Sequence, residues 1–160
     1  MPTRSANWQE EKTLKIKVLD KEFEQHYLDA YAHAGDTGID MLADHTEKVC
    51  GCGLATGAVT FGTSLCVAIP SGCVGLVFAR SGLGTKHGIV PRNCVGVIDS
   101  GYRGEIKVTL QNLSSISYSV HRGDRIAQLV VMPCVHCKMQ LVDELDDTER
   151  GSDGYGSTGR

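Results

Sequence analysis

Short apolar segments of strand length recur along this chain at regular intervals. Leu14, Ile16 and Val18 alternate with lysines, which is the period of two of a half-buried strand. Further apolar runs lie at 65–69, 74–79, 95–98, 106–110, 126–132 and 139–142. Turn-forming residues separate them at 70–72, 99–101 and 122–124. The pattern predicts an all-β sandwich or barrel, with one short helical segment between Lys21 and Tyr31.

Length and charge narrow the class of protein. With 160 residues, the chain fits one domain with a core of its own. The net charge of −3 gives no general attraction to nucleic acid or to an anionic membrane, so a bound anion requires a local cluster of donors. No apolar run approaches the length of a membrane span, and residues 1–11 have no apolar signal core. We therefore expect a cytoplasmic or nuclear protein.

The seven cysteines are an odd number without a secretion signal, which argues against a disulfide framework. Cys50 and Cys52 together with Cys134 and Cys137 could supply four thiolates to zinc, with His136 as a substitute. However, Cys-x-Cys is a poor tetrahedral pair. We therefore interpret the cysteines as small apolar fillers and expect no stoichiometric zinc.

The C-terminal residues 150–160 are rich in glycine and hydroxyl side chains. Residues 154–159 match the Gly-x-Gly-x-x-Gly pattern, but no strand precedes them and no helix follows, which excludes a dinucleotide-binding fold. Glycines let backbone N–H groups approach phosphate oxygens, Arg150 adds donors, and the Tyr155 ring can cover a base. The segment is typical of a flexible anion-binding lid.

Two further segments carry candidate chemistry. Arg80, Ser81 and Gly82 follow a predicted strand and could form a phosphate cradle, although the same residues also make ordinary turns. Residues 96–104 predict a β-hairpin with Asp99 at the end of its first arm. That carboxylate is either a turn-former or a general base, and its position alone does not decide between the two.

Five motifs occur along the chain in the order found in one enzyme family. They read AGDTGID at 34–40, RSGL at 80–83 followed by Gly88 and Ile89, GVIDSGYRG at 96–104, GDRIAQ at 123–128 and RGSDGYGSTG at 150–159. With these motifs, the sequence from about residue 14 to its end resembles the homotrimeric dUTPases. A single match could arise by chance, whereas five in register could not.

The resemblance implies a fold and an assembly. Members of the family form a distorted, jelly-roll-like β-barrel and assemble as homotrimers whose active sites combine motifs from all three chains. By similarity, we expect a flexible N-terminal arm at 1–13, a barrel domain at 14–145 and a mobile lid at 146–160.

The resemblance also implies an activity: Mg²⁺-dependent hydrolysis of dUTP to dUMP and pyrophosphate, which limits uracil in DNA and supplies dUMP for thymidylate synthesis. Asp99 matches the carboxylate that assists in-line attack of water on the α-phosphorus. Asp40 matches a position that reaches the metal through water. The positions that match substrate contacts are Arg80, Ser81, Gly82, Asn93, Gly96, Ile98, Tyr102, Gln128, Arg150, Tyr155, Gly156, Ser157 and Thr158.

Some features depart from the family, and two alternatives follow. Ala79 stands where Pro is usual, Gly101 where Asp is frequent, and Asp153 where Gly is common, while residues 49–57 match nothing specific in the family.

A related dCTP deaminase needs a Glu in the strand after the 96–104 segment, and residues 106–112 contain no carboxylate. The second alternative is a binding protein on this scaffold, with 49–57 as the surface to examine.

Overall fold

The computed structural model describes residues 13–31, 33–51 and 57–152. Strands dominate it, as the alternating sequence predicts. The elements in chain order are β1 (Lys15–Val18), η1 (Lys21–Phe23), α1 (Glu24–Leu28), β2 (Ile39–Leu42), β3 (Glu47–Val49), β4 (Ala58–Ala68), β5 (Cys73–Ala79), α2 (Ser81–His87), β6 (Ile89–Pro91), β7 (Gly96–Ile98), β8 (Glu105–Asn112), β9 (Tyr118–Val120) and β10 (Arg125–Pro133).

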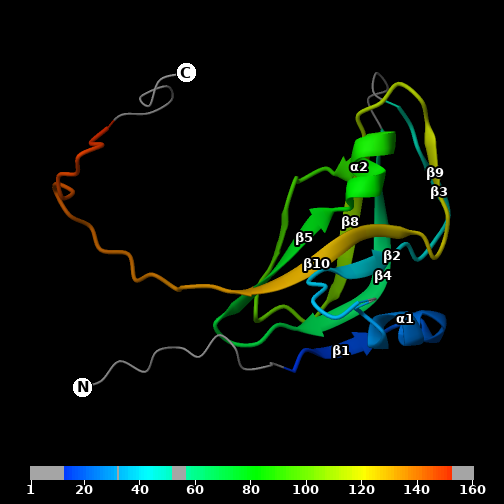
Figure 1. The fold of residues 1–160 in the computed structure, drawn as a ribbon, viewed down its shortest axis with the longest axis horizontal. Coiled ribbons are helices and arrows are strands. Elements are labelled where there is room, and N and C mark those ends of the chain that lie inside the picture. Colours follow the sequence, from blue (N-terminus) through cyan, green and yellow to red (C-terminus); the bar gives the residue numbers. More distant parts are fainter. Residues whose placement is uncertain (1–12, 32, 52–56, 153–160) are drawn as a thin grey trace.

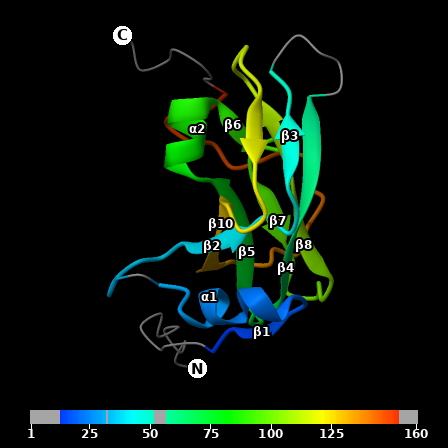
Figure 2. The same ribbon diagram turned by 90° about the vertical axis from the view of Figure 1, so that its right-hand side faces the viewer.

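The strands form two four-stranded antiparallel sheets and a ribbon. One sheet has the order β1-β4-β8-β6, the other β2-β10-β5-β7, and β3 pairs with β9. Figures 1 and 2 show the sheets enclosing a common interior. Its fully buried side chains include Met41, Phe61, Leu65, Ile106, Leu110, Ile126 and Leu129. The predicted all-β, jelly-roll-like barrel is confirmed.

β5 shows how the sequence pattern produces a sheet with two different faces. Cys73, Gly75 and Val77 are buried, while the residues between them are partly exposed. Because successive side chains of a strand point to opposite faces, the second set forms the outer surface of the sheet. This outer face, at the Ala79 end of β5, carries part of the candidate site described below.

The helical segments are partly as expected. The predicted helical segment after Lys21 is confirmed as η1 and α1. The sequence analysis did not predict α2. The residues after Arg80, which were interpreted as a cradle or a turn, begin a seven-residue helix. It ends at Gly88, whose φ of 68° is the left-handed conformation that glycine adopts without strain.

The predicted hairpin at residues 96–104 is wrong. Its first arm, β7, pairs with β5, whereas its second arm, β8, pairs with β4 and β6 in the other sheet. Residues 99–104 therefore form a crossover turn between the two sheets. Local turn signals alone do not distinguish a hairpin from such a corner, because strand pairing is decided by contacts with distant residues.

The strand predicted at residues 139–142 is also wrong. β-structure ends at Pro133, and the last backbone bond to the barrel runs from the Cys134 N–H to the Gly72 carbonyl at 2.9 Å. Residues 134–152 then leave the barrel (Figure 1), so 134–145 lie outside its sheets. Val135, Met139 and Leu141 are 84, 87 and 100% exposed. A strand needs a partner, and this segment finds none among the described residues of its own chain.

Among the described residues, no helix is long and apolar enough to span a membrane.

Candidate functional site

A groove opens where β7 and β8 separate into different sheets. A hollow of about 420 Å³ lies between them, lined by Val77, Arg92, Asn93, Gly96, Val97, Ile98, Lys107, Val108 and Thr109. A second hollow of about 270 Å³ continues it past Asp99 and Tyr102, and the two share Val97, Ile98 and Lys107. β7 is the last described strand of its sheet, so one edge of its backbone faces away from β5. Four predicted substrate contacts and the predicted catalytic carboxylate therefore line one groove.

Local bonds fasten the crossover turn at 99–104. The Tyr102 N–H donates to the Asp99 carbonyl at 3.0 Å, and its hydroxyl donates to the Glu105 carbonyl at 2.9 Å. The Arg103 guanidinium donates to the carbonyls of Ser100 and Tyr102, each at 2.7 Å. In each of these bonds the two partners are no more than three residues apart. The turn that begins at Asp99 is thus held by bonds within its own segment, while β7 before it is placed by its pairing with β5.

Tight turns also place Asn93 in the groove. The Val95 N–H bonds the Asn93 carbonyl at 2.7 Å, and Cys94 between them has a φ of 63°. A Cβ at Gly96 would lie 3.6 Å from the Asn93 side-chain nitrogen and 3.2 Å from Val77. Glycine at this position keeps the floor of the groove open beside an amide that can donate and accept hydrogen bonds.

A charged cluster lies at the other end of β5, on the outer face of its sheet. Arg80 Nε donates to Asp40 Oδ1 at 2.7 Å, and Arg125 Nη1 donates to Asp40 Oδ2 at 3.3 Å. Arg80 Nη1 also reaches the Arg125 carbonyl at 3.4 Å. One carboxylate is therefore shared by two guanidinium groups, and the cluster keeps a net positive charge.

Gln128 lies beside this cluster because it pairs with Asp40 on one side and Phe78 on the other. Its side-chain nitrogen donates to the Ala79 carbonyl at 3.0 Å. A Cβ at Gly38 would come within 2.6 Å of the Gln128 amide oxygen, so glycine is needed there for the amide to fit.

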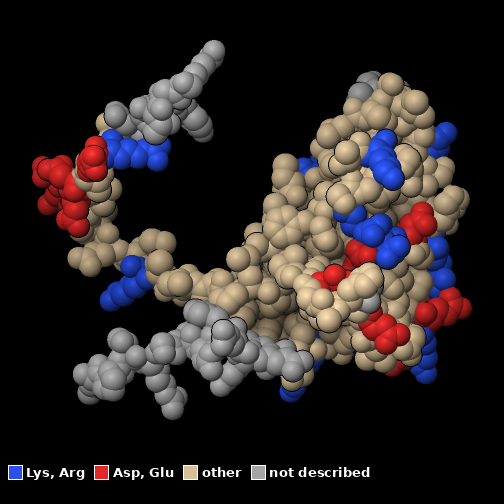
Figure 3. Space-filling view, viewed as in Figure 1, with Lys and Arg blue, Asp and Glu red and all other residues tan. Residues whose placement is uncertain are grey.

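A shallow hollow of about 340 Å³ adjoins the cluster beneath α2. Its lining includes Arg80, Gly82, Lys86 and Arg125, with Asp124 as the acidic member. Ser81, the first residue of α2, is exposed beside it. Figure 3 shows Lys and Arg side chains on this face of the molecule, with Asp and Glu side chains interspersed among them. The lining of the hollow itself has three cations against one carboxylate, so it can attract an anion despite the negative charge of the whole chain.

Within one chain, the groove and the cationic cluster are separate. Ile98 pairs with Gly75, so Asp99 lies level with Val74, whereas Arg80 follows the opposite end of the same strand. The strand between these levels is about 20 Å long at the rise of an extended chain. The predicted site residues therefore form two half-sites that one barrel does not bring together.

The remaining predicted contacts belong to the C-terminal segment. Arg150 lies in its exposed part, outside the barrel sheets. Tyr155, Gly156, Ser157 and Thr158 lie outside the described residues. Their predicted role as a lid stays a prediction.

The chemistry of the donors bears on the predicted metal. In the described part of the chain, no three His, Cys, Asp or Glu side chains are grouped as metal ligands. Mg²⁺ usually takes few protein ligands and keeps several waters, so it requires no such group. A carboxylate offers about four lone-pair directions, and the two bonds from Arg80 and Arg125 leave Asp40 able to hold a water as well. The residues present thus fit a water-mediated contact.

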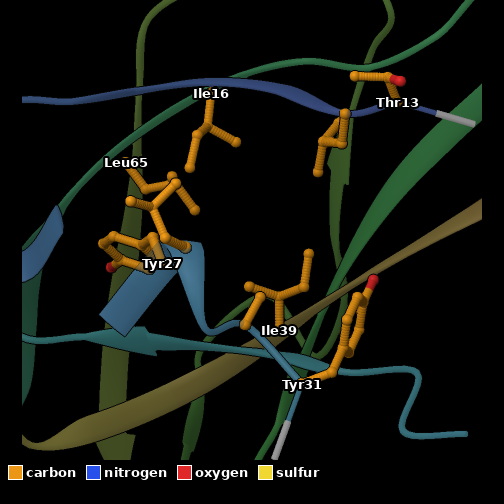
Figure 4. Close-up of a pocket in the computed structure, with 9 residues that line it drawn as sticks. Thr13, Ile16, Tyr27, Tyr31, Ile39 and Leu65 are labelled. Atoms are coloured by element: carbon orange, nitrogen blue, oxygen red, sulfur yellow. The ribbon is translucent and has the colours of Figure 1, made fainter. Parts of the chain in front are cut away.

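Another hollow, of about 570 Å³, lies between β1, α1 and β2. Figure 4 shows Ile16, Tyr27, Ile39 and Leu65 around it, with Tyr31 at its edge. Its side chains are mostly apolar and include no cation, so it does not suit a phosphorylated ligand.

Sequence reasoning missed two residues that the structure makes prominent. Arg125 belongs to the GDRIAQ motif, but the motif alone does not reveal that it pairs with Asp40. Arg103 belongs to the 96–104 motif, and its bonds to the turn carbonyls were not foreseen. In both cases the residue was visible in a motif, while its contact partner was not.

The fold is that of a β-barrel protein with an open groove and a separate cationic cluster, and comparisons with known proteins identify its class. The sequence model of the dUTPase family matches residues 29–159. The deoxyuridine 5′-triphosphate nucleotidohydrolase of Enterobacter sp. (strain 638) is 42% identical over 93% of this chain and 98% of its own. That of Aeromonas salmonicida (strain A449) is 41% identical over 92% and 97%. The dUTPase of Staphylococcus bacteriophage 80alpha, solved with dUpNHpp, superposes with a TM-score of 0.78 at 27% identity, covering 94% of this chain and 100% of its own. The chain therefore belongs to the dUTPase family of enzymes, which confirms the family, the fold class and the enzyme class predicted from the sequence.

Proposed function

We propose that this protein is a Mg²⁺-dependent dUTP nucleotidohydrolase that releases dUMP and pyrophosphate from sites shared between the subunits of a homotrimer. The observation that carries the proposal is the groove between β7 and β8, with Asp99 at its end and an open strand edge along its side. Family membership supplies the substrate, and this groove supplies a place for its nucleoside.

The groove suits the recognition of a uracil base. The open edge of β7 presents backbone N–H and C=O groups near Gly96 and Ile98, and Asn93 adds an amide beside them. A site built from fixed donors and acceptors rejects a base with the wrong pattern, because buried polar groups would be left unpaired. Cytosine would be rejected on this ground. Tyr102, folded over Gly104, would pack against the deoxyribose.

The hydrolytic step needs a base and an environment that accepts negative charge. Asp99 accepts the proton of a water that attacks the α-phosphorus in line, the bond to the bridging oxygen breaks, and pyrophosphate leaves. General-base assistance is worth about 10²–10⁴-fold. Positioning and charge neutralisation by Arg80, Ser81, Gly82 and Gln128 would supply much of the remainder. When bound to the triphosphate, Mg²⁺ would neutralise its charge, with Asp40 holding one of the metal's waters.

The shared site follows from the separation of the half-sites. Asp99 and Arg80 act on the same triphosphate, yet one chain holds them about 20 Å apart along β5. A second subunit that supplies Arg80 to the groove of the first would complete the site. The C-terminal segment already leaves its own barrel with apolar side chains exposed, as expected of a segment that packs on another copy. Arg150 and residues 155–158 would reach the phosphates from there.

A nucleotide panel tests the proposal. Purified protein with Mg²⁺ is incubated with dUTP, dCTP, dTTP and UTP, and the products are separated by anion exchange. Conversion of dUTP alone to dUMP and pyrophosphate is the expected result. Conversion of dCTP to dUTP or dUMP would instead indicate the deaminase, and no reaction with any nucleotide would indicate the binding-protein alternative. In a cell, the expected activity would limit uracil in DNA and supply dUMP for thymidylate synthesis.

A further inference from the structure

We infer that Arg125 is a positioning residue that acts through Asp40 to fix the guanidinium of Arg80 toward the substrate phosphates. This inference rests on the proposed function and deepens it, since it adds a residue to the phosphate half-site and gives Asp40 a second role. It begins from an irregularity in the pairing of β10 with β2.

That irregularity is a bulge between Arg125 and Ala127. Gln128 pairs with Asp40 and Ala127 with Met41, but Arg125 pairs with Leu42, which leaves Ile126 as an extra residue. In an unbroken ladder Arg125 would lie one position further along and on the opposite face of the sheet, because a slip of one residue reverses the direction of a side chain. The bulge therefore brings Arg125 to the face that carries Asp40.

On that face the two arginines hold the carboxylate from two sides. Asp40 is 22% exposed and Arg80 28%, whereas Arg125 is 55% exposed and covers the pair from the solvent side. Arg80 uses Nε for Asp40 and Nη1 for the Arg125 carbonyl. A guanidinium has five N–H donors in a fixed plane, so these bonds fix the plane and leave donors of Arg80 for a ligand.

Charge explains why Arg125 is needed. If Asp40 paired with Arg80 alone, its negative charge would neutralise the guanidinium that has to attract the triphosphate. With Arg125 sharing the carboxylate, the cluster keeps a positive charge beside the hollow under α2. Without Arg125, Asp40 is free to turn with Arg80, and the phosphates meet a less ordered and less positive surface.

The test compares ligands that do and do not contain the β- and γ-phosphates. Binding of dUMP and of the imido analogue dUpNHpp to the full-length protein is measured by calorimetry for the wild type and for Arg125→Gln. We expect Arg125→Gln to weaken dUpNHpp binding about ten-fold, the scale of one hydrogen bond to a charged group, and dUMP binding by less than two-fold. Arg125→Lys, which keeps the charge, should recover part of the loss. A structural defect would weaken both ligands equally, and that result overturns the inference, as does an unchanged affinity for dUpNHpp.

A double-mutant cycle separates action through Asp40 from direct contact with the ligand. If Arg125 acts through Asp40, the Asp40→Asn and Arg125→Gln pair should lose little more affinity than the stronger single variant. Fully additive losses would overturn the inference. Arg122→Gln is the matched control: Arg122 lies in the same turn region but pairs with Asp20 and Glu22, so its loss should lower the melting temperature and leave both affinities unchanged. Failure of the wild type to hydrolyse dUTP would refute the proposed function, whereas wild-type activity with an unaffected Arg125→Gln would refute this inference alone.

Discussion

The two half-sites lie at opposite ends of β5 and are built in different ways. The crossover turn at 99–104 is held by bonds between residues no more than three apart in the sequence. The cationic cluster joins residues 40, 80 and 125, which come from three different strands or their ends. The turn that carries Asp99 is therefore local, whereas the cationic cluster depends on the register of a whole sheet. From this difference we expect the turn at Asp99 to tolerate changes elsewhere in the barrel better than the contacts of Arg80 and Arg125 do.

The largest expected effect tests the local half-site. Asp99→Asn removes the proton acceptor while keeping the size of the side chain and the backbone turn. We expect the turnover of dUTP to fall by about 10²–10⁴-fold, with binding of dUpNHpp retained. Steady-state kinetics and calorimetry on the same preparation check this. Turnover close to that of the wild type would show that another group accepts the proton.

Subunit mixing tests whether the half-sites meet between chains. Asp99→Asn and Arg80→Ala subunits should each be nearly inactive as pure preparations. Unfolded together and refolded as a mixture, they should recover activity, because about a quarter of randomly mixed sites combine an intact Asp99 with an intact Arg80 from another chain. The measurement is the dUTPase rate of the mixture against the two separate refolded controls. No recovery would indicate that both residues act within one chain, and the two half-sites would then not meet between subunits.

Gly104→Ala probes how firmly the turn holds Tyr102. A Cβ at this position would lie 2.5 Å from the Tyr102 hydroxyl and 2.7 Å from its ring, so the whole side chain must move. Because Tyr102 is partly exposed, it can swing outward, and we expect a several-fold rise in KM for dUTP at a stability cost of about 1 kcal/mol. Gly101→Ala is the control, since nothing lies within 4 Å of the added methyl. Equal effects of the two variants would show that Tyr102 does not contribute to binding.

The difference between local and long-range contacts also explains which features could be predicted from the sequence. One alternating segment and several short apolar runs predicted β1, part of β4, β5, β7, β8 and β10, because burial of apolar side chains in a strand leaves a local pattern. The short strands β2, β3, β6 and β9 were missed. The turn at 99–101 was predicted because Asp, Ser and Gly are themselves local turn signals. The pairing of β7 and β8 with different sheets was not, since each strand's partner lies elsewhere in the chain. The Arg125 contact was missed because it depends on a single extra residue in β10.

Alkaline pH should weaken the barrel through Tyr27, whose phenol is buried in the core. Burial is the main cause that raises the pKa of the Tyr27 phenol from 10.0 to about 12. Its hydroxyl donates to the Thr63 carbonyl at 2.6 Å, so the neutral form suits the folded state. Stability from this group is complete below pH 10.0 and is lost as the pH rises toward 12. The melting temperatures of the wild type and of Tyr27→Phe should therefore converge above pH 10. If the two plots of melting temperature against pH stay parallel, ionisation of Tyr27 does not cause the loss of stability.

The smallest expected effect concerns the contact between Arg122 and the segment before α1. The Glu22 N–H, followed by the Arg122 guanidinium, holds the pKa of Asp20 below its usual 3.8, which favours the charged form in the folded state. The resulting stability is present above pH 3.8 and is lost as the pH falls through the lowered pKa. Asp20→Asn keeps an oxygen that can accept from Glu22 but removes the charge. Its small loss of melting temperature near neutral pH should shrink below pH 3.8, while KM for dUTP stays unchanged. A changed KM would mean that this exposed ion pair influences the cationic cluster through the β9–β10 turn, and the two half-sites would then differ even more in their dependence on distant residues.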